Sequence, residues 1–579
     1  MSARSARRSI VHTERPRLPR ARLVGPADPS EAVQVTLSIR RNPAAPPLPD
    51  HEYWVDTPPG RRAFLTPEQF AARYGATEQD LNAVTTFASE HGLRVVEANS
   101  GRRSVVLSGT VAQMNDAFGV TLNDYQVPGQ VEPSAFTGRR GPVPAQTHRG
   151  YDGTVQLPYA VADIVEDVVG LDNRRTGGRN WTNDDPAHIS TLTVPQVVSK
   201  YNFPTNSAAG QSIGIVSMGG GYDPADVTAY FNSFHGSLTA PTIVTRSVNQ
   251  GTNGGQGDPE TLQDILISSS VAQGATIVVY FTETTGLGDA QAWLNLLNRL
   301  IAPDSGETAP PVMSSSFFVA QSDDGTTVTT ADLTTISSKF QEVASLGITF
   351  FIAAGDSGSD SGVGDGKVHV QYPGSDPWVT SCGGTALGTD GSGNLDETVW
   401  NDSFSSQGAT LFGATGGGVS DFFALPAWQS SADVPPSFND NKVRRGVPDV
   451  AGNASPNSGY PMSLTEGTAT ISFPGNGTSA VAPLYAGLTA LMIATLGQPI
   501  GFLNPTLYAL GEGIFRDITV GNNQWGDPAN KATHAYTAGV GWDACTGLGV
   551  VDGNELLSAL QQLSSSSMVP ILELLLNQT

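Results

Sequence analysis

The stretch that decides the fold is ITFFIAAGDSGS, residues 348–359. Its first seven residues are almost entirely apolar, and a Gly-Asp-Ser-Gly turn follows them. A short apolar run bounded by turn residues is typical of a strand that is buried on both faces. Because such strands occur in parallel sheets covered by helices, this stretch predicts an α/β fold, with Asp356 just beyond the carboxyl end of a strand.

Three other segments show the same pattern, and helical patterns lie between them. They are residues 212–216, 276–281 and 311–315. From about residue 191 the chain therefore predicts a doubly wound parallel sheet. Ligands of such sheets bind beyond the carboxyl ends of the strands, which makes Asp356 a candidate site residue.

The first part of the chain is organised differently. An alternating segment at 33–41 predicts a half-buried strand, and a capping box of Thr66 and Gln69 predicts the start of a helix. Alternating strands and helices in so short a segment predict a small α+β domain of the split βαβ, ferredoxin-like kind. The later helix and strand patterns are at 77–91, 93–97, 104–108 and 110–118.

Charge divides the chain at nearly the same place. Residues 1–179 contain 21 Arg, no Lys and 19 acidic residues, whereas the remainder contains 10 basic and 35 acidic residues. The acidic part argues against nucleic acid as a partner and suits a protein that works in acid, although solubility alone is the simpler explanation. The predicted divisions are a basic leader at 1–32, a small domain at 33–173, a linker with a processing site at 174–190, a large domain at 191–563 and a tail at 564–579.

Two cysteines, Cys382 and Cys545, are too few for a disulfide framework, and we expect both to be buried free thiols. The basic N-terminus lacks the apolar segment of a secretory signal. Since no run of 18 apolar residues occurs, no transmembrane helix is expected.

A glycine turn leads directly into an apolar helix at 475–497, GNGTSAVAPLYAGLTALMIATLG. Ser479 falls at the start of this helix, where unpaired backbone N–H groups and the helix dipole stabilise an anion. A role as a helix cap is the alternative, but the surrounding GNG and the wholly apolar helix favour a catalytic serine. Ser357, in the motif GDSG, looks like the nucleophile of a trypsin-like protease. Such loops belong to antiparallel barrels, so Ser357 is not the preferred nucleophile.

A serine nucleophile needs a base. Among the eight histidines only His235, in FHGS, imitates a subtilisin-like motif, and Ser217 stands where subtilisins have an aspartate. Glu260 and Asp264 are better placed, because residues four apart share one helix face with Cβ atoms about 5 to 6 Å apart. Two carboxyl groups at that distance share protons, so one of them can act as a base in acid. The alternative is an ordinary solvated helix face.

In that order, the motifs ETLQD, AAGDSGS and NGTSAVAPL resemble those of the sedolisins, the serine-carboxyl peptidases, and especially their kumamolisin-like branch. The resemblance extends from about residue 33 to residue 563 and includes GLDNR, CGGT, GGGVS, RGVPDVAGNA and WDACTGLG. It implies a subtilisin-like catalytic domain and a prodomain that inhibits its own enzyme until self-processing removes it. It also implies a secreted, monomeric, acid-acting serine endopeptidase whose substrates are proteins and peptides.

The resemblance implies a role for each matching residue. Ser479 is the expected nucleophile, Glu260 the general base, and Asp264 the residue that orients Glu260 and shares its proton. Asp356 is the expected oxyanion donor, a protonated carboxyl group where subtilisins have an asparagine. A carboxyl group with a reference pKa of ~3.9 donates only in acid or when its pKa is raised, whereas a histidine base, at ~6.5, would be protonated there.

A second site is implied near the C-terminus. The segments FRDITVGNN and AYTAGVGWDACTGLG resemble the family's calcium loop, which implies one Ca²⁺ held by carboxylates and backbone carbonyls. Without the resemblance, two aspartates among glycines would be ordinary turn residues. The implied ligands are Asp517, Ile518, Gly539, Gly541 and Asp543.

The chain also departs from its relatives. Phe317 and Phe318 replace small residues on the substrate-binding strand, and Gln371 stands where some relatives have an acid facing the specificity pocket. Subsite preferences therefore do not carry over. Two rival functions stay open: a histidine-dependent subtilase that uses His235, and an inactive binding protein on a peptidase fold.

Overall fold

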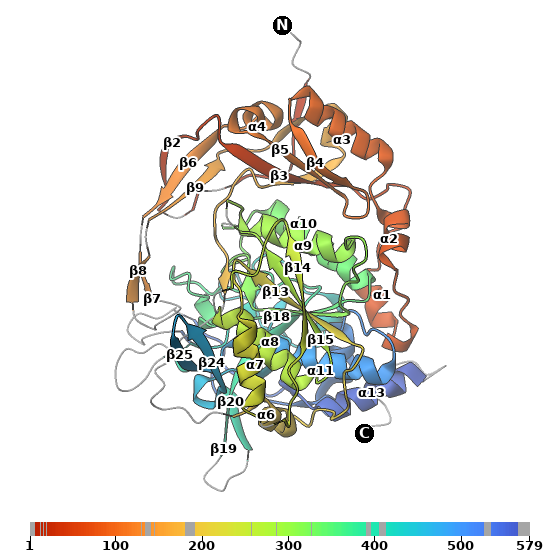
Figure 1. Cartoon of the computed structure of the whole chain (residues 1–579), viewed down its shortest axis with the longest axis vertical. Coiled ribbons are helices and arrows are strands. Elements are labelled where there is room, and N and C mark those ends of the chain that lie inside the picture. Colours follow the sequence, from red (N-terminus) through yellow and green to blue (C-terminus); the bar gives the residue numbers. More distant parts are fainter. Residues whose placement is uncertain are drawn as a thin grey trace.

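The computed structural model describes residues 6–565, apart from 12, 16, 19, 129, 134–139, 144, 180–191, 235, 256–257, 285, 326, 390–394, 404–412 and 526–533. The described chain forms two packed units (Figure 1). We call residues 6–172 the cap and residues 192–565 the body. His235, most of the predicted linker at 174–190 and most of the predicted tail at 564–579 lie outside the described residues.

The cap is built on an antiparallel sheet in the order β11-β3-β5-β4, and the helices α2, α3 and α4 lie between its strands in the chain. Chain order and strand order together give the split βαβ arrangement that the sequence predicts. The capping box is confirmed, since Thr66 Oγ1 accepts from Gln69 N and Gln69 Oε1 accepts from Thr66 N. The elements are β3 (Ala32–Ile39), α2 (Pro67–Tyr74), α3 (Glu78–Glu90), β4 (Arg94–Asn99), β5 (Ser104–Thr110), α4 (Val111–Phe118) and β11 (Val165–Val169).

The cap also contains strands that the sequence does not predict. They are short and partly polar, so they show neither a clear alternation nor an apolar run. A second sheet has the order β2-β6-β9, and β7 and β8 form a separate hairpin. These additional elements are β1 (Arg7–Ser9), β2 (Arg22–Pro26), β6 (Leu122–Val127), β7 (Gln130–Pro133), β8 (Arg140–Val143), β9 (Gln146–Tyr151), β10 (Gln156–Pro158) and α5 (Tyr159–Ala162).

The body is built on a sheet in the order β14-β15-β13-β16-β18-β19-β20, in which every pair is parallel except β19 with β20. The four predicted buried strands are confirmed as β13, β15, β16 and β18, and the predicted parallel α/β fold is confirmed with them. The edge strand β14 and the Gly-rich β19 lack long apolar runs, which is why the sequence does not predict them. The strands are β13 (Ser212–Met218), β14 (Thr242–Val248), β15 (Thr276–Thr282), β16 (Val312–Ser315), β18 (Thr349–Ala353), β19 (Thr380–Thr389), β20 (Leu395–Val399) and β23 (Val450–Asn453), which pairs with β19.

Helices cover both faces of this sheet. Ile213, Ile215 and Phe351 pack on one face with α8 and α11, whereas Val278 and Phe350 pack on the other face with α9 and α10. The second face is turned toward the cap (Figure 1). The helices are α6 (Val194–Lys200), α7 (Pro224–Asn232), α8 (Pro259–Val271), α9 (Asp289–Ile301), α10 (Thr330–Ser345), α11 (Val481–Leu496), α12 (Asn504–Leu510) and α13 (Gly553–Ser565).

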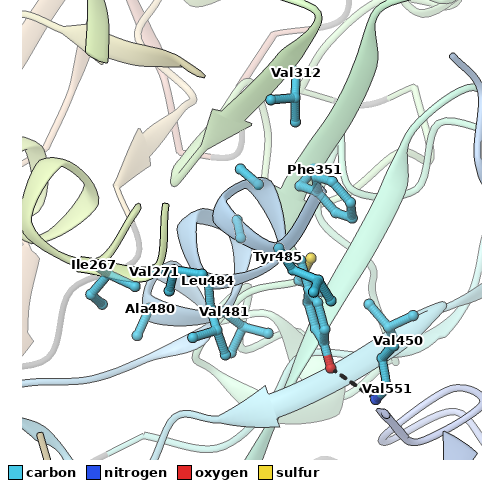
Figure 2. Close-up of a cluster of buried hydrophobic side chains, with 14 of the residues drawn as sticks. Ile267, Val271, Val312, Phe351, Val450, Ala480, Val481, Leu484, Tyr485 and Val551 are labelled. Atoms are coloured by element: carbon cyan, nitrogen blue, oxygen red, sulfur yellow. Dashed lines mark hydrogen bonds between the residues drawn. The ribbon is translucent and has the colours of Figure 1, made fainter. Parts of the chain in front are cut away.

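Helix α11 runs through the core of the body. Figure 2 shows Val481 and Leu484 beside Ile267 and Val271 of α8, and Tyr485 accepting a hydrogen bond from Val551 N. The helical segment 478–496 is long and apolar enough to cross a membrane by length and composition. However, 83% of its most apolar 18-residue stretch is buried inside the protein. Burial in the core accounts for this hydropathy, because a helix that is hydrophobic all round packs on all sides.

The cap contacts the body at several places. Buried Arg103 and Arg15 of the cap pair with Glu342 and Asp332 of α10. Between β3 and α2, α1 (His51–Asp56) and a short turn of helix, η1 (Pro59–Arg61), contact α12 and α13 of the body. Trp54 of α1, 1% exposed, belongs to the same apolar cluster as α11.

Candidate active site

Ser479 lies at the start of α11, in a short helical turn formed by residues 478–480. The turn begins at Gly477, whose φ of +79° is costly for any residue with a side chain. A Cβ atom there would lie 2.3 Å from Asp356 Oδ2, which is a steric overlap. The glycine thus places the end of β18 directly against the residues that precede Ser479, and Ser479 itself is fully buried.

Helix α8 carries Glu260 and Asp264, and both side chains are 0% exposed. The helix begins at Asp258, which accepts from Glu260 N at 3.1 Å. Gln263, between the two acids, donates to Asn476 O at 3.1 Å and accepts from Asn476 N at 2.8 Å. This pair of hydrogen bonds holds α8 against the loop that leads to Ser479. The two carboxyl groups are therefore buried in the body and do not form a solvated helix face.

Ser316 connects the acid pair to the serine. Its hydroxyl Oγ lies 2.8 Å from Asp264 Oδ1 and 3.3 Å from the backbone oxygen of Ser479, and it donates to one of them at a time. Burial raises the pKa of Asp264 well above its ordinary value, so this group favours its protonated form. The sequence analysis did not single out Ser316. It directly follows β16, so the rule that led to Asp356 could have found it.

Asp356 follows the end of β18, as predicted. Its Oδ1 accepts from Thr478 N at 2.8 Å and from Thr478 Oγ1 at 2.7 Å. Its other oxygen, Oδ2, is buried and has no hydrogen-bond partner among the described residues. Burial raises the pKa of Asp356 to about 6. In mild acid this side chain is therefore a protonated carboxyl group that can donate from the loop beside Ser479.

The described histidines contact other groups. Ser217, where a subtilisin would have its aspartate, hydrogen-bonds to Thr261 Oγ1 at 2.8 Å. The rival base His235 lies outside the described residues. The described histidines contact the following partners: His51 with Trp378, His91 with Asp116, His148 with Tyr125, His369 with Ser322 and Asp365, and His534 with Phe438.

The described part of the linker lies on the strand that follows Ser316. Strand β12 (Gly178–Arg179) pairs antiparallel with β17 (Phe317–Phe318). Phe318 therefore pairs with the linker through its backbone. Its large side chain, in place of the small residue of the relatives, does not prevent this pairing. Gln371 lies behind the site, with its side chain against Gly355, where a Cβ atom would be 2.7 Å from its Cδ.

The five residues of the predicted calcium loop lie together. Asp517 Oδ2 accepts from Gly541 N at 2.8 Å, and Asp543 Oδ2 accepts from Gly539 N at 3.2 Å. Asp517 Oδ1 is buried and has no hydrogen-bond partner among the described residues. Ile518, next along the chain, is 1% exposed. Two carboxylates with nearby backbone carbonyls are a donor set that fits a hard cation such as Ca²⁺.

Residues 19–174 match the family model of the pro-kumamolisin activation domain. Kumamolisin of Bacillus sp. (strain MN-32) is 37% identical over 561 residues, covering 94% of each chain. Tripeptidyl-peptidase sed5 of Aspergillus fumigatus is 34% identical over 583 residues, covering 95% of this chain and 96% of its own. The solved structure of Pseudomonas sedolisin, a serine-carboxyl proteinase, aligns with a TM-score of 0.52 at 24% identity and covers 65% of this chain and 99% of its own.

These findings agree with the sequence and the fold. The structural likeness supports the subtilisin-like α/β fold of the body. The similarity to kumamolisin and sed5 spans the cap, the linker and the body, and the activation-domain match covers most of the cap. The chain therefore belongs to the sedolisin family of serine-carboxyl peptidases, as a proenzyme with a pro-kumamolisin activation domain.

Proposed function

We propose that this protein is an acid-acting serine endopeptidase that is secreted as a self-processing proenzyme and acts as a monomer on proteins and peptides. The observation that carries this proposal is the pair of contacts through which Ser316 joins buried Asp264 to the helix start at Ser479, with Glu260 buried on the same helix four residues before Asp264. Three acids buried beside a serine at a helix start are costly to keep unless they perform chemistry.

Each residue has a distinct task in the proposed reaction. Glu260 takes the proton from Ser479 Oγ as this oxygen attacks the peptide carbonyl carbon, and returns it to the leaving amine. Asp264, held by Ser316, shares this proton and keeps Glu260 oriented. Asp356 and the backbone N–H of Ser479 donate to the oxyanion. A water molecule then hydrolyses the acyl-enzyme in the same way.

The requirement for acid follows from Asp356. Only its protonated form can donate to an oxyanion, and its pKa is about 6 because of burial. Activity should therefore fall as the pH rises through this value. A histidine base has the opposite dependence, because histidine is protonated and inactive in acid.

The path of the linker favours an endopeptidase. The matched relative sed5 carries the name of a tripeptidyl-peptidase, an enzyme that must stop the chain three residues before the cut. Here the described segment that pairs with β17 continues in the N-terminal direction along the body, where Asp289 accepts hydrogen bonds from Gly177 and Arg175. A substrate in this path can extend well beyond three residues on that side.

The cap is the proposed inhibitor. It continues into the linker that pairs with β17, and its own arginines pair with acids of α10, among them Arg103 with Glu342. Burial would raise the pKa of Glu342, but Arg103, Lys339 and Arg41 outweigh it and lower this pKa. At a pH above the ordinary pKa of a glutamate, the Glu342 carboxylate therefore stabilises the docked cap. This stabilisation is lost as the pH falls through the lowered pKa of Glu342 in the docked state. Acid thus releases the cap, and self-cleavage at the linker completes maturation.

We also propose one structural Ca²⁺ at the C-terminal loop, held by the carboxylates of Asp517 and Asp543 and the backbone oxygens of Ile518, Gly539 and Gly541. The partnerless Oδ1 of Asp517 supports this proposal. The ion would fasten residues 517–518 to 539–543. It would stabilise the body beneath the site and take no part in the reaction.

The test is a pH–rate profile of the matured enzyme, with Glu260→Gln compared with His235→Ala. We expect activity only in acid, roughly pH 3 to 6, loss of activity in Glu260→Gln, and little change in His235→Ala. A neutral optimum with His235 essential would establish the rival subtilase. If the cap is removed and the folded body cleaves no denatured protein in this range, the rival reading of an inactive binding protein is correct.

A further inference from the structure

The linker is bound at one point by a single buried carboxylate. Asp289, the first residue of α9, is 4% exposed. Its Oδ1 accepts from Arg175 Nε at 2.9 Å, and its Oδ2 accepts from the backbone N–H groups of Thr176 and Gly177, both at 2.8 Å. One side chain of the body thus recognises one cation and two consecutive peptide groups.

This carboxylate lies next to the strand that pairs with the linker. Gly178 pairs with Phe318, and the preceding Thr176 donates through Oγ1 to Val319 O at 2.8 Å. A peptide that pairs with β17 in the same direction must therefore pass Asp289 before it reaches β17. Asp289 belongs to the body, and its helix is anchored by Trp293 and Leu296, both 0% exposed, so it stays in place when the cap leaves.

The position between the cation and the strand excludes side chains. A Cβ atom on Gly177 would lie 2.1 Å from Phe318 O and 3.0 Å from Val319 O. Both of these atoms are backbone atoms, so the overlap cannot be relieved by rotating a side chain. A chain that follows this path needs glycine at this point.

We infer that Asp289 forms an outer substrate subsite of the mature enzyme, which selects a basic residue two positions before a glycine, as in Arg175-Thr176-Gly177. The inference rests on the proposed function, because it requires substrates to follow the path of the linker along β17. Arginine suits the subsite better than lysine, since its planar guanidinium keeps its donors in a fixed geometry beside the carboxylate.

The size of the selection follows from the contact. Hydrogen bonds to a charged group contribute more than neutral ones, but the Arg175 side chain is 44% exposed, and solvent weakens the pair. We therefore expect a preference of about 3- to 10-fold for arginine over alanine. Replacing the glycine two residues after the arginine should lower kcat/KM by more than this, because a side chain there would push the substrate backbone away from β17.

The experiment uses the full chain matured in acid and peptides with the linker sequence RRTGGRNWTNDDP, residues 174–186. One peptide replaces Arg175 by alanine and another replaces Gly177 by alanine. The readout is the ratio of kcat/KM between the parent and each variant peptide, measured at about pH 5 to 6, because burial raises the pKa of Asp289 above its ordinary value and the subsite needs the carboxylate form. Enzymes are the wild type, Asp289→Asn, Asp289→Glu and the surface control Asp440→Asn.

We expect the arginine preference in the wild type and Asp440→Asn, a ratio near 1 in Asp289→Asn, and a partial preference in Asp289→Glu, which keeps the charge. The glycine preference should persist in all four enzymes. Cleavage of all peptides by the wild type with an arginine ratio near 1 would overturn the inference and leave the proposed function intact. If the wild-type enzyme cleaves no peptide or protein at all, the proposed function itself is wrong.

Discussion

Replacing His51 by phenylalanine should keep the cap docked in acid. His51, on α1, stacks against Trp378 of the body with ring centroids 4.0 Å apart, and Phe502 lies 6.1 Å away. The charged groups near it are Arg445 of the body, which disfavours a second cation, and Asp50 of the cap, which favours it. A protonated His51 fits poorly into this aromatic surface, whereas phenylalanine can make the same ring contacts at any pH.

The magnitude follows from proton linkage. Burial, and after it Arg445, lowers the pKa of His51 from 6.5 to about 4 in the docked state. When the cap leaves, the exposed histidine regains its ordinary pKa and takes up a proton. Docking is therefore unaffected above pH 6.5 and weakens as the pH falls from 6.5 to about 4, by about 3 kcal/mol or roughly 100-fold at the lower end.

This interval differs from that of the interface carboxylates. Glu342 has a lowered pKa, so its contribution to docking is lost only below the ordinary value of 4.5. His51 should therefore control the onset of release, and Glu342 its completion. In the sequence, His51 stands in an ordinary polar context, and only the packing of α1 against the body reveals this role.

The assay follows exchange of backbone amide hydrogens in residues 51–61, corrected for the intrinsic effect of pH, in a Ser479→Ala background that prevents cleavage. As the pH falls from about 6.5 to 4, the corrected amide exchange of residues 51–61 should increase steeply in the protein with His51. In His51→Phe this increase should be smaller, by up to ~100-fold. His91→Phe, a change in the cap away from the body, is the control and should behave as the parent. The reasoning is refuted if parent and His51→Phe show the same dependence on pH.

Three further predictions concern the site and the calcium loop. Ser316→Ala leaves Asp264 Oδ1 without its donor and should lower kcat about 10-fold with KM little changed, whereas Ser316→Thr keeps a hydroxyl and should retain most of kcat; an unchanged kcat in Ser316→Ala would show that this hydroxyl has no part in the reaction. Gly477→Ala places a Cβ atom against Asp356 and forces alanine into a positive φ, so it should lower the free energy of unfolding by about 3 kcal/mol or more. An unchanged Tm together with unchanged activity would contradict this. Calcium at a concentration 100 times its Kd should add about 3 kcal/mol to the free energy of unfolding of the parent and so raise its Tm, with no effect on Asp517→Ala. An equal rise of Tm in the two proteins would show that Asp517 is not a ligand.

The sequence predicts the fold where burial leaves a simple pattern. The four central strands are largely apolar because helices cover both of their faces, and the cap helix α2 begins at a recognisable capping box. Strands β14 and β19 escape prediction because the first lies at an edge and the second is rich in glycine. Their places in the sheet depend on pairing with distant strands, which no local pattern records.

The candidate site divides in the same way. Glu260, Asp264, Asp356 and Ser479 stand in motifs whose order and spacing can be recognised in the sequence. Ser316 and Asp289 act through contacts with residues far away in the chain, Ser316 with Ser479 and Asp289 with Arg175. Such long-range contacts become visible only when the strands and the linker are placed in space.

The central claim is that Ser479 cleaves the chain's own linker in acid. The direct measurement incubates the full chain at about pH 4, below the pKa of about 6 of Asp356, and determines the N-terminal sequence of the product, beside Ser479→Ala treated identically. We expect a body whose new N-terminus falls after Arg179 in the parent, and an intact chain in Ser479→Ala. Maturation of Ser479→Ala at the same site and rate would contradict it.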